Sequence, residues 1–155
     1  MQVTSRDVKA FLQSVRVYQL ILAENQSRYL TAYEKATKTT TRLTGMPRGG
    51  GSSGDQAYVE MVASRSKLED WESIAAGKKE RVIQILNEAP LTELQFLILH
   101  ARYIQLMNWK DIIRMLKKSR KISERSIYYE HNAALAAVAN WANIIKIYTK
   151  EILGT

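Results

Sequence analysis

Residues 108–135 read NWKDIIRMLKKSRKISERSIYYEHNAAL, a segment with two helix-start signals and one basic turn. Asn108 is a good N-cap, and the apolar spacing after it predicts a short amphipathic helix over residues 109–116. A basic turn over residues 117–122 follows, and Ser123 is the predicted N-cap of a second helix. A short amphipathic helix, a turn and a capped second helix form the pattern of a helix-turn-helix.

The second helix has two faces with different chemistry. Its predicted inward residues are Ile127, His131, Ala134 and Leu135. The outward face and the basic turn carry cations, which attract phosphates, and also Arg and Asn side chains, which can grip base edges. A solvated basic face is the alternative reading of the same cluster. The candidate DNA-binding residues are Lys117, Lys118, Arg120, Lys121, Ser123, Glu124, Arg125, Ser126, Tyr128, Tyr129 and Asn132.

The flanking segments extend this module in both directions. Pro90 marks a boundary because it cannot continue a helix, and Thr92-Glu93-Leu94-Gln95 then predicts a capping box that opens a new one. The residues that this helix is expected to bury are Leu94, Leu97, Ile98, Ala101, Tyr103 and Ile104. Downstream, apolar residues at helical spacing predict an extended last helix. These apolar residues are Trp141, Ile144, Ile145, Tyr148 and Ile152.

The N-terminal half carries two heptad seams separated by a glycine-rich segment. The first seam predicts a helix from about Ser5 to about Arg42, and the second begins at Met61. The glycine-rich segment predicts a loop over residues 45–55, so the two helices should form an antiparallel, coiled-coil-like hairpin. The seam positions are Val8, Val15, Leu22, Tyr29, Ala36 and Leu43 with Phe11, Tyr18, Asn25, Ala32 and Thr39, then Met61, Leu68, Ala75 and Val82 with Ser64, Trp71, Lys78 and Ile85.

These patterns predict an all-α fold in two parts. A helical hairpin would occupy residues 1–88, and a helix-turn-helix domain with a C-terminal helix extension would occupy residues 91–155. The 155-residue chain has a net charge of +8, and residues 91–155 contain 10 Lys and Arg against 5 Asp and Glu. This concentration of positive charge beside the predicted helix-turn-helix suits nucleic acid.

No catalytic, metal or cofactor site is expected, so the protein is not expected to be an enzyme. The segment from Gly50 to Gly54 matches the spacing of a nucleophile elbow, but that motif needs a strand and the segment also lacks a phosphate-loop lysine. His100 and His131 have no carboxylates at metal-ligand spacing. The chain has no cysteine, which excludes disulfides and thiolate sites, and it has no apolar run long enough for a membrane span or a signal peptide. A cytoplasmic protein is expected.

The helix-turn-helix segment resembles the DNA-binding fourth region of sigma-70-type factors. The residues that carry the resemblance are Leu97-Ile98-Leu99, Tyr103-Ile104, Asn108-Trp109-Lys110-Asp111-Ile112-Ile113, Ser123, Ser126-Ile127 and Ala134-Leu135. The whole plan is similar to small Gram-positive phage regulators of the ArpU/RinA type, which also have a loop like Met46-Pro47-Arg48-Gly49 before such a module. The resemblance covers about residues 44–138. It implies control of late phage genes at promoter DNA, with RNA polymerase as a further candidate partner.

This sequence departs from the sigma-like pattern in two places. The turn over residues 117–122 is longer than the usual tight turn, which weakens a residue-level mapping. Tyr128 and Tyr129 stand where sigma-like recognition helices usually carry Arg or Gln, so the base contacts of that family cannot simply be carried over.

Three functional hypotheses follow from the sequence. The first is a sequence-specific, double-stranded-DNA-binding transcription regulator. The second is a helical protein-binding adaptor whose basic turn contacts an acidic partner, and the third is a phage DNA-packaging recognition subunit. A packaging subunit usually places its DNA-binding module first, whereas here the module comes last. A homo-oligomer is also expected, because a lone hairpin with an apolar tail would leave one apolar face uncovered.

Overall fold

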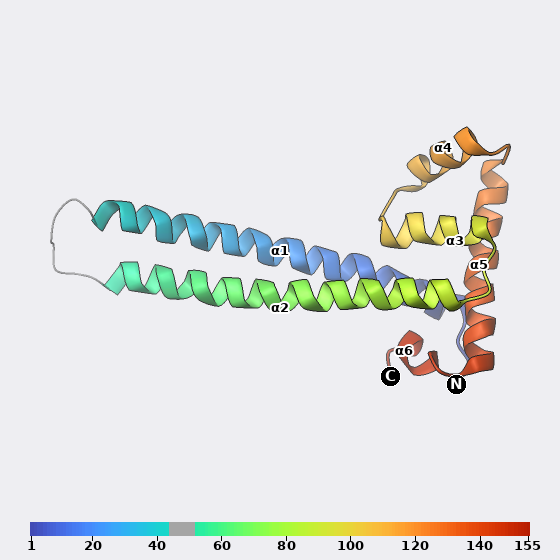
Figure 1. The fold of residues 1–155 in the computed structure, drawn as a ribbon, viewed down its shortest axis with the longest axis horizontal. Coiled ribbons are helices and arrows are strands. Elements are labelled where there is room, and N and C mark those ends of the chain that lie inside the picture. The colour runs from blue at the N-terminus through green and yellow to red at the C-terminus, as the bar shows by residue number, and fades with distance from the viewer. Residues whose placement is uncertain (44–51) are drawn as a thin grey trace. The chain divides into compact units, whose positions relative to one another are not determined.

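A computed structural model shows that the chain is helical. It describes the backbone of residues 1–43 and 52–155 and the side chains of residues 1–38 and 55–155. The elements are α1 (Ser5–Leu43), α2 (Ser52–Glu88), α3 (Glu93–Leu99), the π-helix η1 (His100–Ile104), α4 (Trp109–Ser119), α5 (Glu124–Ile145) and α6 (Thr149–Leu153) (Figure 1). The described residues contain no strand, and the predicted all-α class is confirmed.

These helices form two compact units. Unit 1 contains residues 1–17 and 77–155, and unit 2 contains residues 18–76. Unit 1 therefore combines the start of α1 and the end of α2 with the segment that the sequence assigns to a separate domain at 91–155. A site in unit 1 can draw side chains from both the first and the last residues of the chain.

Unit 2 is an antiparallel pair of helix segments, as the heptad seams predict. Tyr18 of α1 lies against Trp71 of α2, with ring centroids 6.3 Å apart. Asn25 is the one polar residue buried in the described seam of this unit, and its Nδ2 donates to the Ile21 carbonyl at 2.8 Å. The helix α2 begins at Ser52, so the predicted loop is wrong for residues 52–55, which are helical. The rest of the predicted loop, residues 45–51, lies outside the described residues.

The main core of unit 1 forms around the C-terminal half of α5. That helix buries a face of small residues, which lets neighbouring helices approach its backbone closely. The core residues come from several elements: Val8, Phe11, Leu12 and Val15 of α1, Val82, Ile85 and Leu86 of α2, Leu99, Tyr103 and Ile104 of α3 and η1, Ala134, Leu135, Val138, Ala139 and Ala142 of α5, and Ile152 of α6. The predicted inward residues of α5 are all buried.

The predicted extended last helix is broken in two. The helix α5 ends at Ile145, and Lys146 takes a left-handed conformation with φ of 56°. The chain then turns back, so Ile152 is buried while Ile144 stays 79% exposed. The prediction of a single helix through residue 152 is wrong, because apolar spacing does not reveal a left-handed residue.

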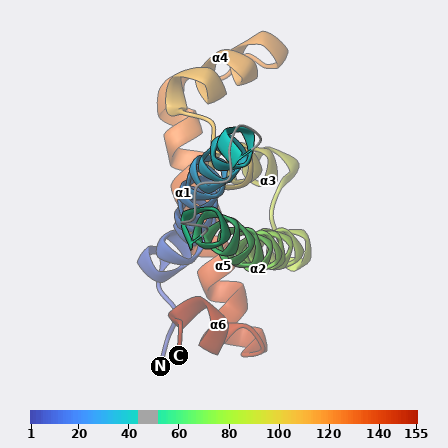
Figure 2. The same cartoon turned by 90° about the vertical axis from the view of Figure 1, so that its left-hand side faces the viewer.

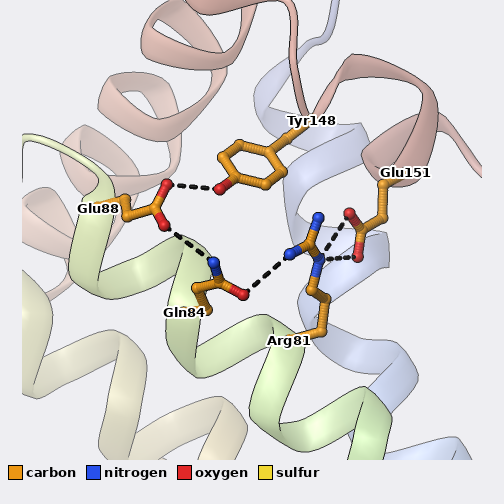
Figure 3. A network of polar contacts seen from close by, with 5 residues as sticks. All are labelled: Arg81, Gln84, Glu88, Tyr148 and Glu151. Atoms are coloured by element: carbon orange, nitrogen blue, oxygen red, sulfur yellow. Dashed lines mark hydrogen bonds and ion pairs between the residues drawn. The ribbon is translucent and has the colours of Figure 1, made fainter.

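A polar network holds α6 against α2 (Figure 3). Arg81 Nε donates to both Glu151 oxygens, at 2.9 and 3.0 Å, and Arg81 Nη1 donates to Gln84 Oε1 at 2.9 Å. Gln84 in turn donates to Glu88, which also accepts from the Tyr148 hydroxyl. These hydrogen bonds lower the pKa of Glu88 and raise the pKa of Tyr148, because each favours the charged carboxylate and the neutral phenol.

We expect Lys146→Gly to raise the free energy of unfolding by about 1 kcal/mol, since a residue other than glycine is sterically strained in the left-handed region. The side chain of Lys146 is exposed, so its removal changes the packing little. Lys150→Gly is the matched control: it removes the same side chain from inside α6 and should lower the free energy of unfolding by a similar amount. Urea denaturation followed by circular dichroism measures both. A fall of equal size in the two variants would contradict the expectation.

Candidate nucleic-acid interface

The helix-turn-helix has a small core of its own. It is built from α3 and η1, α4 and the first turns of α5, and its fully buried members are Ile98, Ala101, Ile112, Leu116 and Ile127. Thr92 and Gln95 form the predicted capping box, and Asn108 Oδ1 accepts from the Asp111 backbone N–H at 2.8 Å. Both predicted helix starts are therefore confirmed.

The turn between α4 and α5 is shorter than the sequence suggests. The helix α4 continues through Ser119, and Arg120 is its C-cap. Ser123 is the N-cap of α5, and its Oγ accepts from the Ser126 backbone N–H at 3.2 Å. The connection is therefore residues 120–123, and the prediction of a long turn over 117–122 is wrong because Lys117 to Ser119 extend the helix by one turn.

Every candidate DNA-binding residue lies on the surface of this module. Lys117 and Lys118 lie in the last turns of α4, and Arg120 and Lys121 lie in the turn. The remaining candidates cap α5 or lie in its first three turns. The exposed candidates are Lys117, Lys118, Arg120, Lys121, Ser123, Glu124, Arg125, Ser126, Tyr128, Tyr129 and Asn132. The fold thus brings all of the predicted residues onto neighbouring elements and leaves their side chains accessible.

The cations of this surface differ in their acidic neighbours. Lys117 Nζ lies 3.8 Å from a Glu124 oxygen, and an Arg120 nitrogen lies 3.6 Å from a Glu93 oxygen. Such exposed ion pairs are weak and can exchange for a phosphate. Among the side chains that the structure describes, no carboxylate lies within 4.0 Å of the charged groups of Lys118, Lys121 or Arg125. These three carry uncompensated positive charge.

A buried aromatic group supports the back of α5. Tyr103 Oη and His131 Nε2 are 2.9 Å apart, and Trp109 packs edge-on to His131 with centroids 4.8 Å apart. The ring of Tyr128 packs against Trp109 in turn, with centroids 4.9 Å apart. Tyr128 is therefore held against α4, whereas Tyr129 is 71% exposed and accessible to a ligand.

Burial lowers the pKa of His131, and the nearby charges of Lys9 and Arg102 lower it further, while a hydrogen bond with Asn132 acts in the opposite direction. The imidazole is consequently neutral at physiological pH. A neutral ring can share one proton with the Tyr103 hydroxyl, whose own pKa is raised by burial.

Sequence reasoning missed two features that shape this surface. The first is η1, since a π-turn has no sequence signal of its own. The second is Arg102, whose Nη1 donates to the Met107 carbonyl at 2.9 Å and whose guanidinium lies 5.2 Å from the Trp109 ring centroid. The available sequence signal was an arginine seven residues before a tryptophan at a predicted helix start, and this signal is weak.

Comparisons with protein-family models, with curated proteins and with solved structures find no match for this chain. Within the described residues, no three His, Asp or Glu side chains gather as they would around a metal ion, and no helix has the length and hydropathy to cross a membrane. Any functional inference therefore depends on the geometry of the interface itself.

We expect Ser123→Ala to lower the free energy of unfolding by about 1 kcal/mol, because the first turn of α5 loses the acceptor for the Ser126 N–H. Hydrogen exchange at the Ser126 amide should become faster in the same variant. Ser126→Ala is the matched control, since it removes only the hydrogen bond between the Ser126 and Ser123 hydroxyls, 2.9 Å apart, and leaves the bond from the Ser126 backbone N–H to Ser123 Oγ in place. An equal fall in the free energy of unfolding in the two variants would contradict a specific contribution of the Ser123 cap.

We expect the free energy of unfolding to fall as the pH drops below about 6.5, the ordinary histidine pKa. The unfolded chain then binds a proton at residue 131 that the folded protein, with its lowered His131 pKa, does not. This contribution of His131 to the free energy of unfolding is fully present above about pH 6.5. It is lost as the pH falls toward the lower pKa that His131 has in the folded protein. Urea denaturation between about pH 7.5 and about pH 5.5 measures it.

Two variants assign this pH dependence to one histidine. His131→Gln should remove most of it, and His100→Gln, which replaces the other histidine of the chain, should retain it. An unchanged pH dependence in His131→Gln would contradict the assignment.

Proposed function

We propose that unit 1 binds double-stranded DNA in a sequence-specific way, with α5 as the recognition helix in the major groove. The observation that carries the proposal is the two-sided character of α5. Its inner face is buried from Ile127 onward, while its N-terminal outer face and the adjoining turn expose cations, tyrosines and an asparagine. A recognition helix needs this division, since one face must be held rigidly while the other reaches base edges.

The local architecture supports this docking mode. Two helices joined by a turn of three or four residues are typical of the motif, and α4 and α5 are joined by residues 120–123. The module also has its own apolar core, which fixes α5 relative to α4. Rigid support matters because base reading needs side chains placed before the duplex arrives.

The outer face of α5 offers suitable groups for base reading. Arg125 and Asn132 are seven residues apart, so they lie on the same side of the helix two turns from each other. Arginine can bind guanine through two hydrogen bonds and asparagine can bind adenine likewise. Tyr129 lies between them along the chain and is the more exposed tyrosine of the pair. We assign base reading to these three residues.

The turn and the end of α4 offer the phosphate contacts. Lys118 and Lys121 are exposed cations without an acidic neighbour among the described side chains. Their attraction to the duplex would not depend on base sequence and would weaken as salt rises.

Control of transcription at promoters, through contact with RNA polymerase, is the wider role that the sigma-like resemblance suggests. A homo-oligomer would present two such modules to one DNA site.

The test begins with selection of a duplex from a randomised library by the full-length protein. Arg125→Ala should then weaken binding to the selected duplex by about tenfold or more and should weaken binding to a scrambled duplex much less. Arg28→Ala, an exposed arginine of unit 2, is the matched control and should change neither affinity. Fluorescence anisotropy with labelled duplexes measures all of these values.

Three outcomes would count against the proposal. Equal weakening on both duplexes in Arg125→Ala would make Arg125 a phosphate contact. Failure to enrich any duplex would remove sequence-specific binding. Selective binding to an acidic protein in the absence of DNA binding would favour the adaptor hypothesis.

Ile127→Asp should abolish binding to every duplex, because it places a carboxylate in the core of the module.

A further inference from the structure

The first turns of α1 carry a basic stripe, defined here as Arg6, Lys9 and Arg16. Their spacing of three and seven residues puts them on one face of the helix, and all three side chains are exposed. The opposite face of the same turns, from Val8 to Val15, is buried in the main core of unit 1. The stripe is therefore on a firmly seated helix, and it belongs to the same compact unit as α4 and α5.

The chain start is attached to α5 on the side of the helix that carries the proposed base-reading residues. Val3 N–H donates to Asn143 Oδ1 at 2.7 Å, and Asn143 Nδ2 donates to the Val3 carbonyl at 2.9 Å. Asn143 comes 18 residues after Arg125, which is about five helical turns, so the two side chains leave α5 in the same direction. Figures 1 and 2 show the chain start beside the C-terminal half of α5.

The charge of Lys9 acts on a buried residue of α5 near the proposed base-reading residues. Lys9 is close enough to His131 for its charge to act on the imidazole, and His131 precedes Asn132 on α5. Asn132 is the furthest of the proposed base-reading residues from the turn. The middle residue of the basic stripe therefore lies within electrostatic range of the residue that precedes Asn132 on α5.

The stripe forms no close ion pair, although the charge of Arg6 contributes to the lowered pKa of Asp7. No carboxylate among the described side chains lies within 4.0 Å of the charged groups of Arg6, Lys9 or Arg16. The one acidic residue within these turns, Asp7, accepts instead from the backbone N–H and hydroxyl of Thr4, at 2.8 and 2.6 Å. Three cations over ten residues of helix span about 15 Å, which is comparable with the width of a DNA groove.

We propose that Arg6, Lys9 and Arg16 form a second phosphate-binding surface that contacts the DNA backbone beside the segment read by α5. This inference rests on the proposed function. The partner is a polyanionic double helix, since a row of cations on a rigid helix matches a row of phosphates. The stripe adds affinity and fixes the orientation of the protein without reading bases.

The salt dependence of DNA binding tests the proposal. The triple variant Arg6→Ala, Lys9→Ala, Arg16→Ala should flatten the plot of log affinity against log salt by about 0.9 for each phosphate that the protein no longer binds. It should weaken binding to selected and scrambled duplexes by the same factor. The triple variant Arg28→Ala, Arg65→Ala, Lys67→Ala removes two arginines and one lysine from unit 2 and should leave the slope unchanged.

The results separate this proposal from the one it rests on. The double variant Lys118→Ala, Lys121→Ala should flatten the slope through the turn. If it does so while the α1 triple variant has the wild-type slope, the second surface is wrong and the helix-turn-helix assignment stands. If the unit 2 triple variant flattens the slope equally, the effect is one of net charge and the second surface is also wrong. If the wild-type protein binds no duplex, both proposals are overturned.

A positional probe gives an independent readout that does not depend on slopes. The chain contains no cysteine, so Lys9→Cys creates a single attachment point for an iron–EDTA cleavage reagent. We expect hydroxyl-radical cleavage of the selected duplex at one flank of the protein's footprint. Cleavage no stronger than that from the cysteine-free protein treated in the same way would overturn the proposal. Circular dichroism of each variant checks that the helices remain folded.

Discussion

The structure of unit 1 depends on burial of one continuous face of α5. The N-terminal part of that face, at Ile127, completes the small core of the helix-turn-helix, and the later part, from Ala134 to Ala142, lies in the main core with α1 and α2. Small side chains in the later part allow helix backbones to come close, so many weak dispersion contacts add up. Because one rigid helix belongs to both cores, the position of the outward residues near its start is set by packing near its end.

The buried pair of Tyr103 and His131 lies where these two cores meet. Burying a hydroxyl and an imidazole in an apolar setting costs free energy unless the two groups form a hydrogen bond with each other. The pair therefore strongly favours one rotation of α5 about its axis. Trp109 continues the contact from His131 to Tyr128 at the surface. Through these contacts, the pair that fixes the packing of the interior also supports Tyr128 against α4, while Tyr129 stays accessible.

Both ends of the chain are fastened to unit 1 by mixed polar and apolar contacts. The ion pair and hydrogen bonds around Arg81 and Glu151 are partly exposed and individually weak, and the buried side chains of Tyr148 and Ile152 supply most of the stabilisation. At the other end, Asn143 pairs with the Val3 peptide group. Fastening the chain start therefore keeps the first turns of α1 in the same compact unit as α5.

The sequence by itself determined the features that local chemistry controls. Helix starts at Thr92, Asn108 and Ser123 are local hydrogen-bonding events, and the buried face of α5 follows from 3.6-residue spacing, so both could be predicted. The tertiary structure alone decided the π-turn at η1, the left-handed break at Lys146 and the grouping of the start of α1 with the C-terminal helices. None of these has a strong local signal in the sequence, and contacts between residues far apart in the chain decide them. At Lys146 such contacts also offset the strain of the left-handed backbone.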